Sequence, residues 1–338
     1  MKNKQILFTA KNTAELVPCD LPAPQPNEIV VRTAVTTVSN GTERANVTGD
    51  PNVSITSGGE VSFPRACGYS ASGTVVAVGA AVTTHAVGDR VALYGSHHKA
   101  YNVLPAARAF RIPDGVSFAA ASMSYIAIFP MAAIRKTRVE MGESALVMGL
   151  GTLGLIAVSL LRTAGACPIV AADPTPARRA LALTAGADYA LDPTAPDFAE
   201  QVKAITDGGA RVAIEVTGVG AGLNGALDCM ARFGRVALLG CTRSSDFTVD
   251  YYRKVHGPGI TLIGAHTMAR PANDSAPGWF TTADDMRAVL TLMEMGRLDL
   301  DRLICERATP EECPAVYRRL AEGTDFPAVM QFVWENDV

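Results

Sequence analysis

The spacing of hydrophobic positions changes near residue 122, and this change divides the chain into two kinds of structure. Before it, β-branched residues dominate short runs such as 28–38 and 73–79, and a Gly-Asp turn opens another run at 88–94. This pattern predicts a small, irregular β-barrel. After it, apolar runs alternate with helical segments up to about residue 266. Such alternation predicts a parallel sheet with helices on both faces, and so an α/β fold.

The predicted strands of the second part are 144–148, 167–172, 212–216, 235–239 and 259–264. Helices such as 154–163 and 176–185 lie between them. The last 70 residues add helical segments at about 282–295 and 310–322 and a closing strand at 328–334.

The composition agrees with a globular chain of about two domains. It has 338 residues, of which 48% are hydrophobic, and a net charge of −3 without a basic run, which argues against nucleic-acid binding. Seven scattered cysteines without a CxxC pair and no secretory segment predict free thiols and a cytoplasmic protein. Two uncharged stretches, 68–88 and 115–134, hold too many small, polar or β-branched residues for a membrane span and predict buried core instead.

The clearest chemical motif is a glycine-rich turn between the run 144–148 and the next helix. In such a turn the first glycine permits the tight bend, the second lets the backbone approach a pyrophosphate, and the third lets the helix pack closely on the strand. The N–H groups at the start of the helix then face the anion. The motif predicts dinucleotide binding by Gly149, Gly151, Thr152, Leu153 and Gly154.

An acid ends the next predicted strand: Asp173 lies 19 residues after Gly154. A carboxylate there accepts hydrogen bonds from the adenosine ribose hydroxyls and repels a 2′-phosphate, so NAD is favoured over NADP. Within the sequence Asp173-Pro174-Thr175-Pro176, the same carboxylate is also a candidate cap for the following helix, and the two roles are compatible.

With these residues the chain resembles the medium-chain dehydrogenase/reductase superfamily of the alcohol dehydrogenase type, over nearly its whole length. The resemblance also rests on Gly88-Asp-Arg-Val91 and on three pairs that follow successive strands. It implies a GroES-like catalytic domain formed by residues 1–125 and 268–338, with an inserted Rossmann NAD-binding domain at 126–267. It further implies cofactor contacts for Arg178, Thr217, Gly218, Leu239, Gly240 and Ala265.

The metal-binding positions of zinc-dependent members are changed in this chain. Where those members have Cys-Gly-Thr-Asp and Gly-His-Glu, the sequence has Asn40-Gly41-Thr42-Glu43 and Gly68-Tyr69-Ser70, and the last ligand position falls at Ser124. None of these four aligned positions offers a ligand that zinc prefers, and the four-cysteine structural lobe is missing. Adjacent His97 and His98 project in different directions. We therefore predict an enzyme with no metal and no zinc.

Hydride transfer from an alcohol requires the hydroxyl proton to leave, which without a metal needs a general base or a hydroxyl relay. Tyr69 is the leading catalytic candidate, Thr42 matches the family's relay hydroxyl, and Glu43 and His98 are alternatives. In zinc-dependent members the acid at the position of Glu43 lies beneath the metal and is mostly structural. Since a phenol near pKa 10 is a weak base, Tyr69 needs a nearby cation, Lys99 or a protonated His98, or acts only by donating a hydrogen bond. The predicted substrate contacts are Asn40, Tyr125, His266 and Trp279.

The Asn-Gly-Thr-Glu segment and the polar stretch 266–279 resemble bacterial sugar and glycoside dehydrogenases and bacteriochlorophyllide dehydrogenases. This predicts a NAD-linked dehydrogenase of a small secondary alcohol such as a polyol, sugar or glycoside. A zinc-free quinone or enoyl reductase is the alternative, against which Asp173 counts because those members usually prefer NADPH. A second alternative is a non-catalytic dinucleotide-binding protein, which the retained Thr42 and Tyr69 disfavour.

The resemblance also predicts the assembly. The family commonly dimerises by pairing the edge strands of two Rossmann sheets, and here that edge is the apolar run 259–264. An unpaired edge of this kind promotes aggregation, so we expect a homodimer.

Overall fold

The computed structural model describes residues 2–54, 58–323 and 325–335 and divides into two compact units. Unit 1 comprises Met1–Ile126, Leu290–Gly296 and Ile304–Val338, and unit 2 comprises Ala127–Val289 and Arg297–Leu303. The predicted α/β fold, with a β-barrel and a parallel-sheet domain, is confirmed. The units differ from the predicted domains at residues 268–289 and 297–303, which group with the parallel sheet, and at Ile126, which groups with the barrel.

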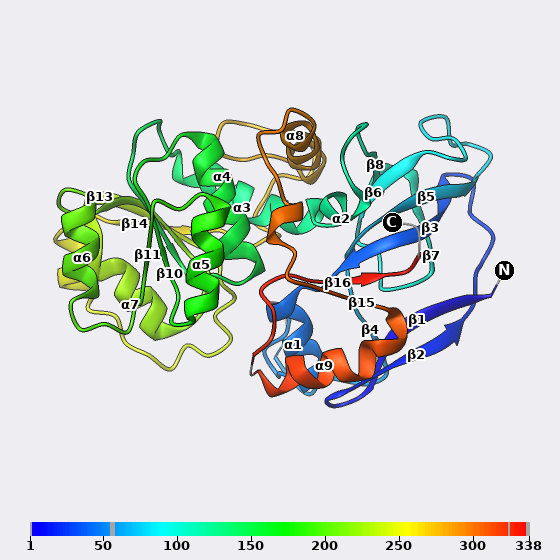
Figure 1. Cartoon of the computed structure of the whole chain (residues 1–338), viewed down its shortest axis with the longest axis horizontal. Helices are drawn as coiled ribbons and strands as arrows, with labels where there is room; N and C mark the ends of the chain where they lie inside the picture. The colour runs from blue at the N-terminus through cyan, green and yellow to red at the C-terminus, as the bar shows by residue number, and fades with distance from the viewer. Residues whose placement is uncertain (1, 55–57, 324, 336–338) are drawn as a thin grey trace. The chain divides into compact units, whose positions relative to one another are not determined.

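The sheet of unit 2 is entirely parallel, with the strand order β11-β10-β9-β12-β13-β14. Figure 1 labels four of its strands, β10, β11, β13 and β14. From β9 the chain continues to β10 and β11 on one side and returns to β12 on the other, so the direction of winding reverses beside β9. Ligands bind at the carboxyl ends of the strands at such a point. The strands are β9 (Ala145–Met148), β10 (Ile169–Ala172), β11 (Tyr189–Leu191), β12 (Ala210–Glu215), β13 (Met230–Leu238) and β14 (Thr261–Gly264).

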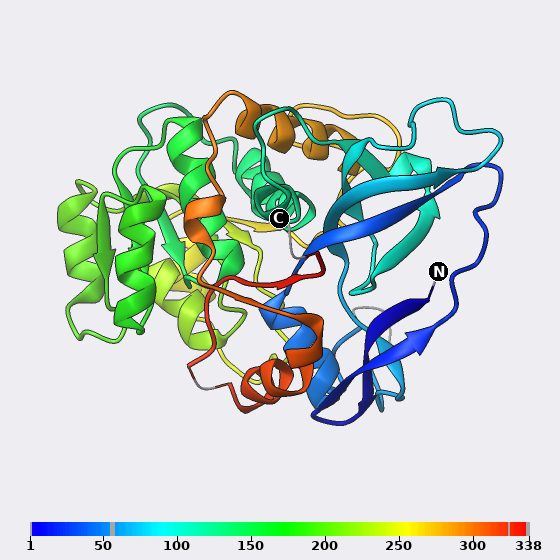
Figure 2. The same ribbon diagram turned by 45° about the vertical axis from the view of Figure 1, so that its right-hand side comes forward.

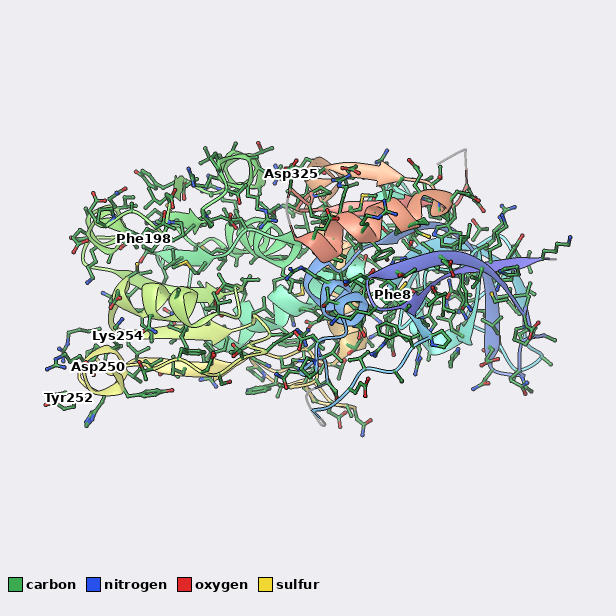
Figure 3. The ribbon with its side chains drawn as sticks, turned by 90° about the horizontal axis from the view of Figure 1, so that it is seen from below. Phe8, Phe198, Asp250, Tyr252, Lys254 and Asp325 are labelled. Carbon is green, nitrogen blue, oxygen red and sulfur yellow. The ribbon has the colours of Figure 1, made fainter. Side chains whose placement is uncertain are left out.

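Helices cover both faces of this sheet, which explains why all of β9 is buried. Leu146 and Met148 share a core with Phe198 of α6 (Phe198–Ile205), labelled in Figure 3, and with Leu227 of α7 (Gly220–Asp228). The intervening Val147 points to the other face, towards α4 (Thr152–Ala164). α5 (Pro176–Ala185) packs beside α4.

Unit 1 contains the barrel, to which both ends of the chain contribute strands. The main sheet has the order β15-β16-β3-β5-β6-β8, and β7 also pairs with β3. The C-terminal strand β16 pairs antiparallel with β3. The strands are β3 (Glu28–Thr37), β5 (Ser70–Val78), β6 (Arg90–Tyr94), β7 (Tyr101–Pro105), β8 (Ala109–Arg111), β15 (Glu306–Ala308) and β16 (Met330–Val333).

A smaller sheet of unit 1, with the order β2-β1-β4, packs against two helices (Figure 2). The helices are α1 (Asn40–Thr48) and α9 (Cys313–Glu322), and the strands are β1 (Asn3–Ala10), β2 (Thr13–Cys19) and β4 (Arg65–Ala66). Phe8, labelled in Figure 3, packs edge-on against Tyr317 of α9 with ring centroids 4.9 Å apart. Since Tyr317 is fully buried, α9 closes this core.

The uncharged stretch at 115–134 forms short and long helices rather than a membrane span. No helix of the described residues is long and apolar enough to cross a membrane. All seven cysteines are free thiols. The remaining helices are α2 (Phe118–Ala121), α3 (Ser124–Thr137), α8 (Thr282–Glu294), the short 3-10 helices Ala106–Arg108, Asp301–Leu303 and Pro310–Glu312, and the π-helix Tyr252–His256.

Candidate functional site

The glycine-rich turn connects β9 to α4 and has the geometry that the motif predicts. Gly149 has a φ of 97°, a left-handed value that a side chain strains. A Cβ on Gly154 would lie 1.9 Å from the Gly149 carbonyl oxygen, so no larger residue fits there. Gly151 faces open space and is the N-cap residue of α4, with no side chain to cap the first turn. The turn therefore presents main-chain N–H groups to an anion.

Asp173 lies beside this turn and holds it in place. Its Oδ2 atom accepts a hydrogen bond from the Leu150 N–H at 2.9 Å, and its Oδ1 atom accepts one from the Thr175 N–H at 2.9 Å. The Nη1 atom of Arg178 lies 3.7 Å from Oδ2, so the structure brings these two predicted cofactor residues together. The helix-capping alternative is wrong, because the N-cap residue of α5 is Thr175.

The predicted cofactor residues after β12, β13 and β14 lie at the carboxyl edge of the unit 2 sheet. Glu215, which the sequence analysis missed, accepts hydrogen bonds from the Thr217 N–H at 2.8 Å, from the Thr217 hydroxyl and from the Gly218 N–H at 3.2 Å. Burial raises the pKa of Glu215, and these hydrogen bonds offset only part of the effect. A Cβ on Gly240 would lie 2.4 Å from the Gly218 nitrogen, so the two turns pack directly on each other.

Two of the predicted substrate residues lie in the segment that follows β14. The Trp279 ring covers Lys136, whose Nζ atom lies 4.7 Å from the ring centroid and donates a hydrogen bond to the Gly264 carbonyl at 3.2 Å. His266 accepts a hydrogen bond from the Met268 N–H. Burial and the positive charges of Lys136 and Arg243 lower the pKa of His266. The indole of Trp279 is thus fixed by a cation next to the residues that end β14.

Three predicted site residues of unit 1 come together around a phenol. Tyr69 donates a hydrogen bond to the hydroxyl of Ser39, a residue that the sequence analysis missed. Its ring packs edge-on against Tyr125 with centroids 5.6 Å apart. Burial raises the pKa of Tyr69 well above its ordinary value, and hydrogen bonds with Ser39 and Thr42 offset only part of this. Tyr69 therefore stays protonated and acts as a hydrogen-bond donor.

The positions aligned with the family's metal ligands carry unsatisfied oxygen atoms. The Oδ1 atom of Asn40 and the Oγ atom of Ser124 are buried and have no hydrogen-bond partner in the part of the chain that the structure describes. The amide nitrogen of Asn40 donates to the Pro327 carbonyl at 2.9 Å, and the Ser70 hydroxyl donates to the Ser122 carbonyl at 2.6 Å. A buried oxygen without a partner costs about 1–3 kcal/mol, and a bound hydroxyl group would satisfy it.

Glu43 and His98 lie in the interior of unit 1, which corrects their predicted catalytic roles. The imidazole is fully buried, with Nε2 at 3.1 Å from a Glu43 carboxylate oxygen and Nδ1 at 2.6 Å from the Thr36 hydroxyl. Glu43 also accepts hydrogen bonds from the Ser39 N–H at 2.8 Å and from the Tyr317 hydroxyl at 2.5 Å. Both ring nitrogens of His98 are thus occupied, and His98 does not supply the cation that Tyr69 was expected to need.

The contacts of Glu43 and Cys67 shift the pKa values of both side chains. Burial raises the pKa of Glu43, but the charge of His98 and the hydrogen bonds from His98, Ser39 and Tyr317 outweigh burial and bring it below its ordinary value. Burial raises the pKa of the neighbouring Cys67 thiol well above its ordinary value, and the charge of Glu43 adds to the effect. Cys67 is therefore a neutral thiol beside an ionised carboxylate.

The prediction of no metal site is contradicted by a cluster of three residues that could hold a metal ion. Ligand atoms of Glu43, Cys67 and His98 all lie within 4.8 Å of one another, and carboxylate, thiolate and imidazole are the donors that zinc prefers. The hydrogen bond between the second His98 nitrogen and the Thr36 hydroxyl is the kind of support that metal-binding histidines have. An ion here would displace the Cys67 proton and replace the hydrogen bond between His98 Nε2 and Glu43. All three residues are buried, and they supply three of the four protein ligands that a structural zinc site has.

Two protein-family models match the chain in succession. The alcohol dehydrogenase GroES-like domain matches residues 25–122, and the zinc-binding dehydrogenase model matches residues 152–277. Together they cover β3 to β8 of the barrel and most of the parallel-sheet unit.

Curated relatives match along nearly the full length. D-guloside 3-dehydrogenase of Escherichia coli (strain K12) is 27% identical over 338 residues, covering 94% of this chain and 96% of its own. L-threonine 3-dehydrogenase of Thermococcus kodakarensis is 27% identical and covers 87% of each chain. The crystal structure of 2R,3R-butanediol dehydrogenase from Bacillus subtilis superposes with a TM-score of 0.80 at 21% identity, over 98% of this chain and 99% of its own, a likeness of fold.

Proposed function

The chain belongs to the medium-chain dehydrogenase/reductase superfamily, and from this premise we propose that it transfers a hydride between NAD and a secondary alcohol of a polyol, sugar or glycoside. Its relatives are dehydrogenases, and the chain is an oxidoreductase of that type. The glycine turn carries the proposal. Gly149 and Gly154 lie too close to other atoms to carry a side chain, and the open space beside the turn at Gly151 is where a pyrophosphate approaches the backbone.

The nature of the substrate follows from the unsatisfied oxygens. Asn40 Oδ1 and Ser124 Oγ are buried atoms whose hydrogen bonds no described residue supplies. A substrate with several hydroxyl groups can donate to such atoms, whereas a quinone or enone has no hydroxyl to donate. The relative named D-guloside 3-dehydrogenase supports a glycoside-like substrate.

Tyr69 is the proposed proton donor. Its phenol is kept protonated by burial, and Ser39 and Thr42 hold it in place. In the direction of ketone reduction, the Tyr69 O–H turns from the Ser39 hydroxyl to the carbonyl oxygen and gives it a proton as the hydride from NADH arrives at the carbon. The neighbouring hydroxyls of Ser39 and Thr42 then relay a proton from solvent to the phenolate, which restores the phenol.

Tyr69→Phe tests this role against a matched control. We expect turnover to fall about 10²–10⁴-fold, the usual contribution of a general acid, with NADH affinity unchanged. Tyr94→Phe is the control, because the Tyr94 ring packs on the other tyrosine next to Tyr69, with its centroid 5.3 Å from that of Tyr125. Loss of its hydroxyl should leave turnover nearly intact. The assay follows NADH with sugars, glycosides and polyols, and separately with quinones and enones. Full activity of Tyr69→Phe, or activity only on quinones with NADPH, would refute the proposal.

The pH dependence offers a second test of Tyr69. Because burial holds its pKa above the ordinary value near 10, the phenol should not ionise in the working range of the enzyme. We expect Tyr69 to cause no titration step in ketone reduction below about pH 10. The pH profiles of the wild type and of Tyr69→Phe should therefore have the same shape up to that pH. A titration near neutral pH that Tyr69→Phe abolishes would mean that the phenolate is the active form.

Any metal bound by this chain is proposed to lie at Glu43, Cys67 and His98. Zinc content measured on the wild type and on Cys67→Ser locates it, because an ion in this cluster is lost with the thiol. An ion held at the aligned positions around Asn40 and Tyr69 would be unaffected by Cys67→Ser. Retention of stoichiometric zinc by Cys67→Ser would therefore exclude the cluster.

Assembly is proposed to be a homodimer formed through β14. This strand ends the sheet of unit 2, and in the described chain it pairs only with β13. Leu262 and Ile263 in it are only partly buried. A second copy of β14 would satisfy the edge and cover these side chains. Light scattering at micromolar concentration should give twice the monomer mass, and a monomer would contradict the proposal.

A further inference from the structure

We propose that unit 1 carries a second ligand site, an oxyanion-binding cavity beside the loop at residues 95–99. The cavity has a volume of about 300 Å³. Its chemically active lining consists of Ser96, His97, Lys99, Arg108 and Asp20. None of Asn40, Tyr69, Ser70 and Ser124 lines it, so it is separate from the proposed substrate positions and goes beyond the proposed function. We call it the anion cavity.

A buried hydroxyl in this cavity lacks a partner. Ser96 is only 3% exposed, and its Oγ atom makes no hydrogen bond to any residue that the structure describes. A hydroxyl can donate one hydrogen bond and accept others, so an oxygen-rich ligand at this place would satisfy it. An unsatisfied buried hydroxyl costs folding free energy, which a ligand recovers on binding.

Two cations in the lining are free of ion pairs. Within the described ranges, neither Lys99 nor Arg108 has a carboxylate within 4.0 Å, although Asp20 also lines the cavity. Arg108 lies over the Tyr94 ring, with its guanidinium carbon 5.9 Å from the centroid. The side chains of Lys99 and Arg108 make no hydrogen bond with the described protein. Their charges and donors are therefore available to a ligand.

The frame of the cavity is held by two asparagines. Asn102 accepts a hydrogen bond from the His97 N–H at 2.9 Å and donates to the His97 carbonyl at 3.1 Å, which fixes the loop. Asn3 accepts from the Tyr101 N–H at 2.9 Å and donates to the Tyr101 carbonyl at 3.0 Å. Because these bonds exist without a ligand, little ordering of the loop is required on binding.

These features select a phosphate group. At neutral pH a phosphate monoester carries a charge of about −1.5 to −2, which matches two cations, and its oxygens accept hydrogen bonds from the Ser96 hydroxyl, Lys99 and Arg108. The volume lies at the lower end of the range for small-molecule sites and admits a phosphate with a small attached group. Inorganic phosphate and a phosphorylated sugar share this chemistry.

The test measures anion binding by calorimetry to the protein saturated with NADH, which keeps phosphate from the glycine turn. Inorganic phosphate, glucose 6-phosphate and glucose are compared at constant ionic strength. We expect both phosphate-containing ligands to bind, and we attribute any binding of glucose alone to the proposed substrate site, where sugars are candidates. Tighter binding of glucose 6-phosphate would identify a sugar phosphate as the occupant, and equal binding would identify the free anion.

Variants assign the binding to the anion cavity. Lys99→Gln and Arg108→Gln should each weaken phosphate binding about tenfold or more, and the double variant should abolish it. Ser96→Ala should weaken it less. Lys203→Gln removes an exposed charge from α6 of unit 2 and is the control. NADH affinity should be unchanged in all of them, which shows that they fold. Phosphate binding that survives the double variant, or no binding of either phosphate ligand to the wild type, overturns the proposal.

Discussion

The glycine turn of unit 2 and the buried cluster of unit 1 are built in opposite ways. The turn is made from six consecutive residues and works through main-chain N–H groups, with Gly149 and Gly154 selected because side chains are absent there. The cluster is made from side chains, and its Glu43 accepts a hydrogen bond from Tyr317, which lies 274 positions further along the chain. A site formed by the backbone is destroyed by adding atoms. A site formed by buried side chains is destroyed by removing one partner.

Gly154→Ala should have the largest effect, because it adds an atom where the backbone allows none. Its Cβ would lie 1.9 Å from the Gly149 carbonyl oxygen, so the turn must open or α4 must shift. We expect NADH binding, followed by fluorescence titration, to be lost and the thermal stability of the protein to fall.

Gly151→Ala is the matched control within the same turn. No atom lies within 4 Å of its added Cβ, so this variant should keep the melting temperature of the wild type. It should still bind NADH more weakly, because the methyl group faces the place where a pyrophosphate approaches. If Gly154→Ala bound NADH as the wild type does, the turn would not be the cofactor site.

Glu43→Gln tests the opposite principle in the buried cluster. It keeps the shape of the side chain but removes a charge that His98 and Tyr317 contact. Breaking a buried charged pair costs about 3–5 kcal/mol, so urea unfolding should show a loss of that order. Asp250→Asn breaks an exposed pair with Arg253 and should leave stability unchanged.

The pH dependence of stability should change in the same variant. The pKa of Glu43 is lowered in the folded protein, so its contribution is present above the unfolded value, near 4.3, and is lost as the pH falls through the folded value. Glu43→Gln should therefore flatten the acid limb of the stability profile. An unchanged acid limb would mean that Glu43 is not ionised in the folded protein.

The same contrast explains which parts of the molecule the sequence predicted. The helix predicted at 176–185 has those bounds in the structure, since Pro176 opens it and Gly186, with a φ of 112°, ends it. These signals are local. The helix α1 was missed because Asn40-Gly41-Thr42-Glu43 was compared with a ligand motif and its own N-cap makes no side-chain hydrogen bond.

The sequence predicted two of the three residues of the buried cluster as site residues, Glu43 and His98, but not Cys67. Glu43 and His98 were named, but as catalytic candidates, because nothing local distinguishes a buried acid from an exposed one. Cys67 directly precedes the segment Gly68-Tyr69-Ser70 and was passed over, since the family's ligand motif begins one residue later. No local signal connects Tyr317 to Glu43. Only the packing of α9 on the smaller sheet brings them within 2.5 Å.

Asp173 differs from the rest of the glycine turn, because it contributes a side chain to a site that is otherwise formed by the backbone. Its carboxylate accepts hydrogen bonds from Leu150 and Thr175 and also faces Arg178. We propose that its charge makes NAD the preferred cofactor, while the nearby Arg178 weakens the repulsion of a 2′-phosphate.

Asp173→Asn separates the charge of this residue from its hydrogen bonds. Its effect should be smaller than those of Gly154→Ala and Glu43→Gln. The amide oxygen still accepts one hydrogen bond, so the turn persists, but the charge that repels a 2′-phosphate is gone. We expect the ratio of kcat/KM for NAD to that for NADP to fall about 10–100-fold, as ~1.5–3 kcal/mol for a hydrogen bond to a charged group implies. Arg178→Gln should move the ratio in the opposite direction, because it removes the cation that would pair with the 2′-phosphate. A wild type that uses NADP better than NAD, or an Asp173→Asn variant with an unchanged ratio, would show that Asp173 serves only to hold the turn.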